Sequence, residues 1–225
     1  MNNPKQLTFP WSKSNKSNFN EYYFDDPNFK LKKILQENDD IFIYGINKTG
    51  KTYLLQSLCN KYAEEGKTSL YIPLIEASSL DTAILDSIEN MDLICIDDLD
   101  SIQNSRSWEL AIFNLINNCL ISGCRLVFSS SNNISDVKFT LKDLESRIKK
   151  IDQIEVFPIR SENISRALIQ ISNHRSINLG DRELSYLMTY SERSISNLVK
   201  ILNKLDALSL EKKRKITIPL IKELT

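Results

Sequence analysis

Glycine and histidine are scarce in this chain of 225 residues, which contains only 5 Gly and a single His, His174. Two of the glycines, Gly45 and Gly50, stand close together, which indicates that they serve the backbone geometry of one loop. The 4 Cys stand in apolar segments without metal-ligand spacing. We therefore predict free thiols and a reducing, cytoplasmic location.

The chain also has no excess of positive or negative charge, and it has no long apolar runs. Lys+Arg and Asp+Glu both count 29, which argues against a protein whose main role is to wrap nucleic acid. No stretch approaches the roughly 18 apolar residues of a membrane span, and the first residues lack the pattern of a signal peptide. We expect no membrane association and no direct sequence-specific DNA binding.

The chain divides into three parts by pattern. Residues 1–18 are rich in Asn, Lys and Ser, and they predict a flexible tail with one apolar cluster. In residues 19–159 short apolar runs alternate with helical patterns, which predicts an α/β core with a five-stranded, mainly parallel sheet. Residues 160–225 carry only helical patterns and predict a small all-helical lid domain. The predicted strands lie near residues 41–44, 69–74, 93–96, 125–129 and 153–157.

One segment fits the phosphate-binding pattern G-x-x-x-x-G-K-[ST] in full: it reads Gly45-Ile46-Asn47-Lys48-Thr49-Gly50-Lys51-Thr52. It follows a predicted strand and begins a predicted helix, so backbone N–H groups and the helix dipole would face phosphate oxygens. We expect Lys51 to reach the β/γ-phosphates and Thr52 to ligate Mg²⁺. The prediction is an ADP or ATP site whose cofactor-binding residues are Gly45, Asn47, Thr49, Gly50, Lys51 and Thr52.

Two further strand ends carry polar groups suited to this chemistry. Asp97 and Asp98 follow an apolar strand, and we expect Asp97 to hold the Mg²⁺ shell. Asp98 stands where many ATPases carry a Glu that polarises water, but its side chain is one methylene shorter. Asn132, in the polar run after the fourth strand, is a candidate for facing the γ-phosphate; a plain polar turn is the alternative.

These motifs, in this order, resemble the AAA+ ATPases, and more closely the DnaA branch of bacterial replication initiators with its short Hda family. Hda proteins promote the inactivation of DnaA. The resemblance runs from about residue 19 to residue 224 and implies a chain without the helix-turn-helix domain of full DnaA. The resembling stretches are Cys95–Asp98, Ser107–Phe113, Asp143–Ile148, Leu202–Asp206 and Ile216–Glu223.

The resemblance implies roles for residues outside the phosphate loop. Arg147 matches the arginine finger that acts in trans on ATP bound to a neighbouring subunit. Tyr23 and Phe24 fall where the family surrounds adenine, with simple core packing as the alternative. The N-terminal peptide resembles the family's sliding-clamp-binding motif through Gln6, Leu7, Phe9 and Pro10.

One departure from the family concerns the lid. Ser196 stands where DnaA and Hda carry an Arg that contacts the nucleotide phosphates, and Arg193 lies about one helical turn earlier. Either Arg193 substitutes for that Arg, or the protein binds nucleotide without such a contact. This departure favours stable ADP binding over rapid turnover.

The favoured hypothesis is an Hda-like regulator of replication initiation. It would bind ADP or ATP, dock on the DNA polymerase III sliding clamp (β), and stimulate hydrolysis of DnaA-bound ATP through Arg147, with weak ATPase activity of its own. The alternatives are an autonomous AAA+ ATPase, a DnaA-like or helicase-loading protein acting on DNA, and a diverged paralogue that brings another protein to the clamp. A homodimer is left open.

Overall fold

The structure is a computed structural model that describes residues 17–224. These residues form two compact units. The first unit contains Glu37–Gly45 and Lys51–Glu155, and the second contains Asn18–Gln36, Ile46–Gly50 and the chain from Val156 onward. The second unit is therefore assembled from three separate parts of the sequence, including five residues of the phosphate-loop motif.

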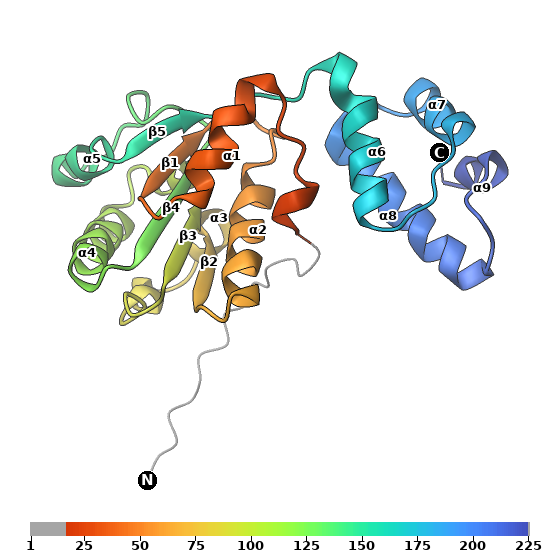
Figure 1. The fold of residues 1–225 in the computed structure, drawn as a ribbon. Helices are drawn as coiled ribbons and strands as arrows, with labels where there is room; N and C mark the ends of the chain where they lie inside the picture. The colour runs from red at the N-terminus through yellow and green to blue at the C-terminus, as the bar shows by residue number, and fades with distance from the viewer. Residues whose placement is uncertain (1–16, 225) are drawn as a thin grey trace, which may run out of the picture. The chain divides into compact units, whose positions relative to one another are not determined.

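The first unit is built on a five-stranded sheet in which every strand pair is parallel, in the order β2-β3-β4-β1-β5 (Figure 1). This confirms the predicted fold class. Central position explains the composition of β1 and β3, which are apolar almost throughout because both of their faces are covered. The strands are β1 (Ile41–Tyr44), β2 (Ser69–Pro73), β3 (Leu93–Asp97), β4 (Arg125–Ser130) and β5 (Asp152–Glu155).

The helices of the first unit connect and cover these strands. On α4, Trp108, Ile112 and Leu115 follow helical spacing and are buried in the same core as Phe42 and Phe128 from the sheet. The helices are α2 (Lys51–Glu64), α3 (Leu74–Ala77), α4 (Arg106–Ser122) and α5 (Lys142–Ile148), with 3-10 turns η3 (Thr82–Leu85) and η4 (Leu99–Ile102).

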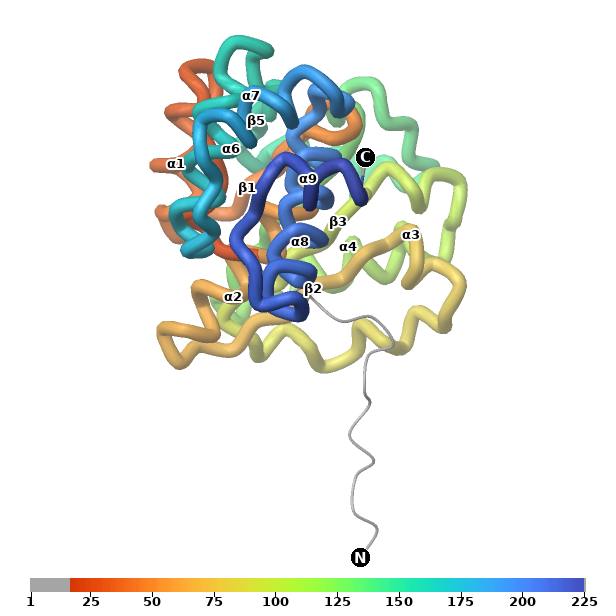
Figure 2. The backbone as a smooth tube through the Cα atoms, turned by 90° about the vertical axis from the view of Figure 1, so that its right-hand side faces the viewer, coloured from red at the N-terminus to blue at the C-terminus, as the bar shows by residue number. Residues whose placement is uncertain are grey.

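The second unit is all helical and has its own core. Helix α6 packs on α8 and α7 packs on α9, and Leu198, Leu202 and Leu205 of α8 are completely buried (Figures 1 and 2). Its helices and turns are η1 (Phe19–Glu21), η2 (Asp26–Asn28), α1 (Phe29–Gln36), η5 (Ser161–Asn163), α6 (Ile164–His174), α7 (Asp181–Tyr190), α8 (Ile195–Lys212) and α9 (Ile218–Lys222). Between residues 17 and 224 no helix is long and apolar enough to cross a membrane.

Two local predictions differ from the structure. The short helix expected at residues 80–88 is only the 3-10 turn η3, because Asp81 caps the Ala83 N–H and Ser87 takes a left-handed backbone with φ 63°. Helix α1 was not predicted, although Leu31 and Leu35 carry the i, i+4 apolar spacing that signals it.

A completely buried carboxylate on α4 holds the segment that leads into α5. Glu109 accepts hydrogen bonds from the backbone N–H of Asn104 (3.1 Å), Thr140 (3.1 Å) and Leu141 (2.7 Å), and from the Thr140 hydroxyl (2.6 Å). Burial alone would raise the pKa of the Glu109 carboxyl, but these hydrogen bonds together bring it below its ordinary value. The start of α5 is thereby fixed to α4.

Replacing this carboxylate should destabilise the first unit. Glu109→Gln places an amide donor against N–H groups, so we expect a loss of about 2–3 kcal/mol of unfolding free energy at pH 7. The wild type's advantage is present above the ordinary Glu pKa and is lost as the pH falls through the lowered folded pKa. Urea unfolding between pH 3 and pH 8 measures the loss of stability and its pH dependence, with the exposed Asp143→Asn as control. Equal unfolding free energies of the wild type and Glu109→Gln at pH 7 would contradict the assignment.

Candidate functional site

The phosphate-loop motif links β1 to α2 through residues with unusual backbone angles. Lys48 and Gly50 have φ of 69° and 93°, and the Thr49 hydroxyl donates to the Ile46 carbonyl at 3.1 Å. Lys48 tolerates its left-handed backbone at a cost, whereas Gly50 adopts its angle without a Cβ to oppose it. The loop therefore has the tight, left-handed backbone that a phosphate cradle requires.

Lys51 is the first residue of α2 and is almost completely buried. Its Nζ donates to the Gly45 carbonyl at 2.6 Å, so the ammonium folds back over the loop that begins at that glycine. Burial lowers the pKa of Lys51, while the nearby carboxylates Asp98, Asp97 and Asp100 oppose that shift. The lysine thus stands within electrostatic reach of the acidic strand end.

Asp97 ends β3, and hydroxyl groups from both neighbouring strands hold its carboxylate. The Tyr71 hydroxyl on β2 donates to Oδ2 at 2.8 Å, and the Ser129 hydroxyl on β4 donates to Oδ1. The side chain is 1% exposed. A buried carboxylate with both oxygens hydrogen-bonded keeps one orientation, which suits a group that must face a ligand from the sheet edge.

Asp98 follows in a left-handed conformation, with φ 56° and ψ 52°. Its N–H donates to the Ser129 hydroxyl at 3.0 Å. Burial, reinforced by Asp97 and Asp100, raises the pKa of Asp98 to about 6, and Lys51 partly offsets the shift. The left-handed residue directs this second acid away from the line of β3.

Asn132, the residue proposed to face the γ-phosphate, is tied to the same strand end. Its side-chain N–H donates to Asp100 at 3.2 Å, and the Ser131 N–H contacts both oxygens of Asp100 at 3.3 Å. The backbone N–H of Asn132 donates to the Ser130 hydroxyl at 3.1 Å. Asp100 thus connects the turn after β3 with the turn after β4.

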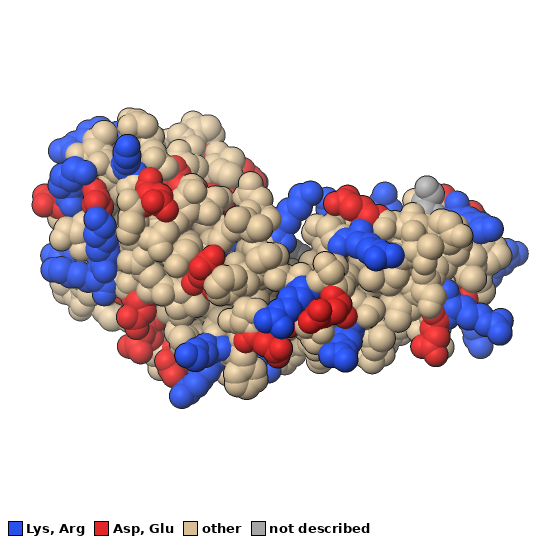
Figure 3. All heavy atoms as spheres, turned by 90° about the horizontal axis from the view of Figure 1, so that it is seen from above, with Lys and Arg blue, Asp and Glu red and all other residues tan. Residues whose placement is uncertain are grey.

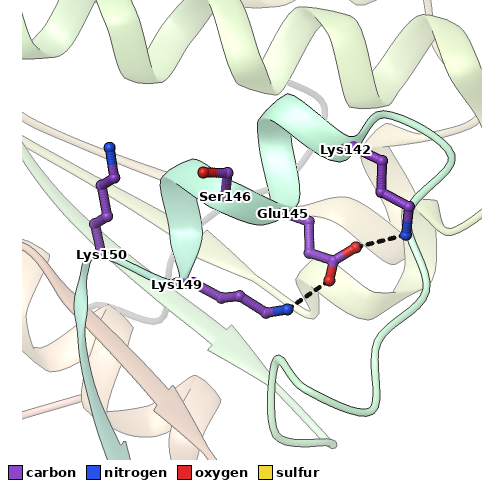
Figure 4. Close-up of a pocket in the computed structure, with 5 residues that line it drawn as sticks. All are labelled: Lys142, Glu145, Ser146, Lys149 and Lys150. Carbon is purple, nitrogen blue, oxygen red and sulfur yellow. Dashed lines mark hydrogen bonds and ion pairs between the residues drawn. The ribbon is translucent and has the colours of Figure 1, made fainter.

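Arg147 lies on α5 and is half-exposed. Within residues 17–224 its guanidinium has no hydrogen-bond or ion-pair partner. The adjacent Glu145 is occupied by Lys142 at 2.9 Å and Lys149 at 2.6 Å, and these bonds lower the pKa of its carboxyl (Figure 4). Lys142, Glu145, Lys149 and Lys150 line a shallow hollow on α5 and the residues after it. Lys and Arg side chains gather at the left of Figure 3, on the side where Figure 1 draws α5.

Other expected site residues lie in the second unit. Phe24 contacts Tyr22 with ring centroids 4.7 Å apart, and Tyr23 is half-buried. Arg193 is exposed and donates from Nε to the Met188 carbonyl at 2.9 Å. The expected clamp-binding residues lie outside the described part of the chain: Gln6, Leu7, Phe9 and Pro10.

The structure thus brings Lys51, Asp97, Asp98 and Asn132 to one edge of the first unit's sheet. Sequence reasoning missed the hydroxyl groups that hold Asp97, and it missed the bridge made by Asp100. In the sequence, Tyr71 and Ser129 stand out only as members of the predicted strands at residues 69–74 and 125–129. No short-range pattern links either residue with Asp97.

A parallel sheet of this order, with a G-x-x-x-x-G-K-T loop after β1 and paired acids after β3, defines a P-loop protein. The chain belongs to the AAA family: the model of the AAA domain matches residues 37–165. The model described as "Hda, lid domain" matches residues 161–225. An uncharacterized protein of Haemophilus influenzae is 30% identical over 226 residues, which cover 98% of this chain and 98% of that protein.

Solved structures of DnaA share the fold. Domain III of the Thermotoga maritima replication initiation protein DnaA superposes with a TM-score of 0.73 at 17% identity, over 94% of this chain and 96% of that one. AMPPCP-bound DnaA from Aquifex aeolicus superposes with a TM-score of 0.69 at 16% identity, over 86% of this chain and 66% of that one. At these identities the likeness establishes the architecture.

The raised pKa of Asp98 gives the site a measurable pH dependence. An acid with a raised folded pKa destabilises the protein once ionised, so the wild type gains stability as the pH falls from 7 to 4. Asp98→Asn should remove this penalty. Solvent screening of the half-exposed carboxylate limits the gain to about 1 kcal/mol at pH 8, vanishing near pH 4. Thermal unfolding across this range measures it, with the exposed Asp136→Asn as control; a pH-independent difference would be contrary to this electrostatic origin.

Proposed function

We propose that this chain is an Hda-like, cytoplasmic regulator of replication initiation. It binds ADP or ATP at its phosphate loop, docks on the DNA-loaded sliding clamp and stimulates hydrolysis of ATP bound to DnaA. Support comes from the AAA-family membership, the match of residues 161–225 to the Hda lid and the geometry of Arg147. Solved structures of DnaA, one of them bound to AMPPCP, share the fold of this chain.

The proposed nucleotide site uses residues of the loop and of the sheet edge. Asn47, Thr49 and Gly50 are proposed to supply backbone N–H groups to the phosphates, and Lys51 to neutralise the β/γ oxygens. Gly45 begins the loop, and its own N–H donates to the Ser130 carbonyl at 3.3 Å. Mg²⁺ fits here as an ion shared with the nucleotide, with Thr52 and Asp97 as the proposed protein ligands. Residues 17–224 contain no cluster of three or more His, Cys, Asp or Glu side chains that would hold a metal alone. Mg²⁺ is usually bound through one or two carboxylates together with substrate phosphates.

Its own turnover is proposed to be weak. Asp98 is shorter than the Glu that polarises water in many ATPases, and Ser196 takes the place of a phosphate-contacting Arg. Arg193 is exposed and bonded to the Met188 carbonyl, so serving a phosphate would require it to leave that acceptor. Tyr23 and Phe24 remain the proposed neighbours of adenine.

Arg147 is the observation that carries the proposal. Its guanidinium is unengaged among the residues that the structure describes, and Glu109 fixes the chain that enters α5. A positioned, unpaired guanidinium matches the negative charge that develops on the γ-phosphate of a bound ATP. Because it is presented at the surface, we assign it to the nucleotide of the partner, DnaA. The clamp peptide would keep the protein on DNA through Gln6, Leu7, Phe9 and Pro10.

Removing the guanidinium should abolish stimulation while leaving the protein folded. With ATP-loaded DnaA and clamp loaded on DNA, we expect Arg147→Ala to reduce the stimulated rate of phosphate release at least ~100-fold, since arginine fingers contribute 10³–10⁵. Arg182→Ala, an exposed arginine of α7, is the control and should retain full stimulation. Undiminished phosphate release with Arg147→Ala would refute the arginine-finger role.

The clamp contact should matter only for recruitment. Gln6→Ala removes a side-chain amide from the docking peptide, so we expect the half-maximal concentration for stimulation to rise about 10-fold, the scale of a lost interfacial hydrogen bond. The maximal rate at saturating protein should be unchanged, and the substitution should have no effect when clamp is omitted. An unaltered concentration dependence would contradict the docking assignment.

An autonomous ATPase is a second candidate, favoured by the raised pKa of Asp98. A carboxyl that titrates near pH 6 is well matched to accepting a proton from an attacking water. A steady-state ATPase assay of the protein alone separates the candidates. Turnover that saturates with ATP and is lost in Asp98→Asn supports the enzyme. Slow turnover at the phosphate loop of this chain, unchanged when DnaA is added, supports the regulator.

A further inference from the structure

The ring of Tyr22 lies against the backbone of the phosphate loop. Its hydroxyl donates to the Thr49 carbonyl at 2.8 Å. A Cβ added at Gly50 would stand 2.8 Å from Cε2 of the ring, closer than side-chain carbons normally approach. All three residues belong to the second unit. The tyrosine therefore contacts the loop by a hydrogen bond, and its ring leaves no room for a side chain at Gly50.

The residue before Tyr22 contacts the C-terminal helices. The Glu21 carboxylate accepts two hydrogen bonds from the Arg175 guanidinium, at 2.7 and 2.9 Å, and both side chains are mostly buried. Arg175 directly follows α6, and it also donates to Asn203 of α8. Glu21 and Tyr22 thus connect α6 and α8 on one side with Thr49 on the other.

The rest of this N-terminal segment is attached to residues 157–163, which lead into α6. Figure 1 shows this part of the chain above α6. Asp25 accepts from the Arg160 N–H at 2.9 Å and from the Asn163 side chain at 2.6 Å. Asn28 exchanges hydrogen bonds with the backbone of Phe157, at 2.9 and 3.0 Å. Amide and carboxylate groups thus anchor the segment, so a movement at Tyr22 is resisted by the helical unit.

We infer that Tyr22 is a positioning residue for nucleotide binding, which holds the phosphate loop in its binding conformation, and that Glu21 couples this loop to helices α6 and α8. The inference rests on the proposed nucleotide site and adds two residues to it. A loop that is already ordered loses less entropy when phosphates bind, so the contact increases affinity without touching the ligand. Because the segment is shared, ligand binding at the loop is felt in the helices.

An alternative role for Tyr22 is packing alone, since its ring also contacts Phe24. Tyr22→Phe keeps the ring and removes only the hydroxyl, which distinguishes the two roles. Burial raises the pKa of the Tyr22 hydroxyl, so it remains a donor at any physiological pH and the comparison is free of titration. If packing is the whole role, the variant should bind nucleotide as the wild type does.

The first experiment measures ADP binding by calorimetry and its release by stopped flow. We expect Tyr22→Phe to weaken ADP binding about 3- to 10-fold, the equivalent of one lost hydrogen bond. Tyr186→Phe is the matched control in the same unit, because this ring stacks on Tyr190 and its hydroxyl makes no hydrogen bond within residues 17–224. Equal ADP affinity in wild type and Tyr22→Phe would overturn the positioning role.

The second experiment follows amide hydrogen exchange. Without nucleotide, exchange at the loop amides should be at least 3-fold faster in Tyr22→Phe than in wild type, whether or not ADP binds. Unchanged loop exchange overturns the inference, while failure of the wild type to bind ADP overturns the proposed nucleotide site. The two failures are therefore distinguishable.

A separate substitution, Glu21→Gln, tests the coupling between the phosphate loop and α6. In wild type, ADP should slow amide exchange in α6 as well as in the loop, and in Glu21→Gln the slowing should be confined to the loop. Glu223→Gln, which breaks a surface ion pair with Lys212 in the same unit, is the control and should behave as wild type. Slowing of α6 that persists in Glu21→Gln would show that the ion pair does not couple the two.

Discussion

Parallel pairing of β1, β3 and β4 brings the carboxyl ends of these three strands to one edge of the sheet, and the chemistry of the first unit depends on that constraint. Lys51, Asp97 and Asn132 are far apart in sequence and become neighbours because their strands share a direction. Burial at this end of the sheet, together with the charges of Asp97 and Asp100, raises the pKa of Asp98. Hydrogen bonds from the Tyr71 and Ser129 hydroxyl groups hold the Asp97 carboxylate in one orientation at this crowded edge.

The second unit contributes the backbone of the phosphate loop, whereas the first unit contributes the charged side chains near it. The second unit includes the middle of the phosphate-loop motif and the segment that carries Tyr22, together with the C-terminal helices. Grouping these pieces makes the loop part of a helical body instead of an appendage of the sheet.

Features encoded by short spacing could be predicted from the sequence, and features encoded by distant contacts could not. The residues of the phosphate-loop motif follow one another in the sequence, and so do the paired acids Asp97 and Asp98. Their patterns alone therefore predicted that both lie at strand ends. Glu109 bonds Thr140 31 residues away, and Tyr22 bonds Thr49 27 residues away, so neither partner could be identified before the fold was known. The expected helix at residues 80–88 failed for a different reason, since Asp81 and Ser87 favour a turn locally over the helical pattern.

We propose that this chain holds nucleotide while the hydrolysis takes place in the partner. A label-placement experiment tests it most directly: ATP labelled at the γ-phosphate is loaded on DnaA alone or on this chain alone, and both are then mixed with DNA-loaded clamp. We expect rapid label release when DnaA carries it, and retention when this chain carries it. Rapid release from this chain, with DnaA-bound label intact, would contradict the claim and identify an enzyme acting at its own phosphate loop.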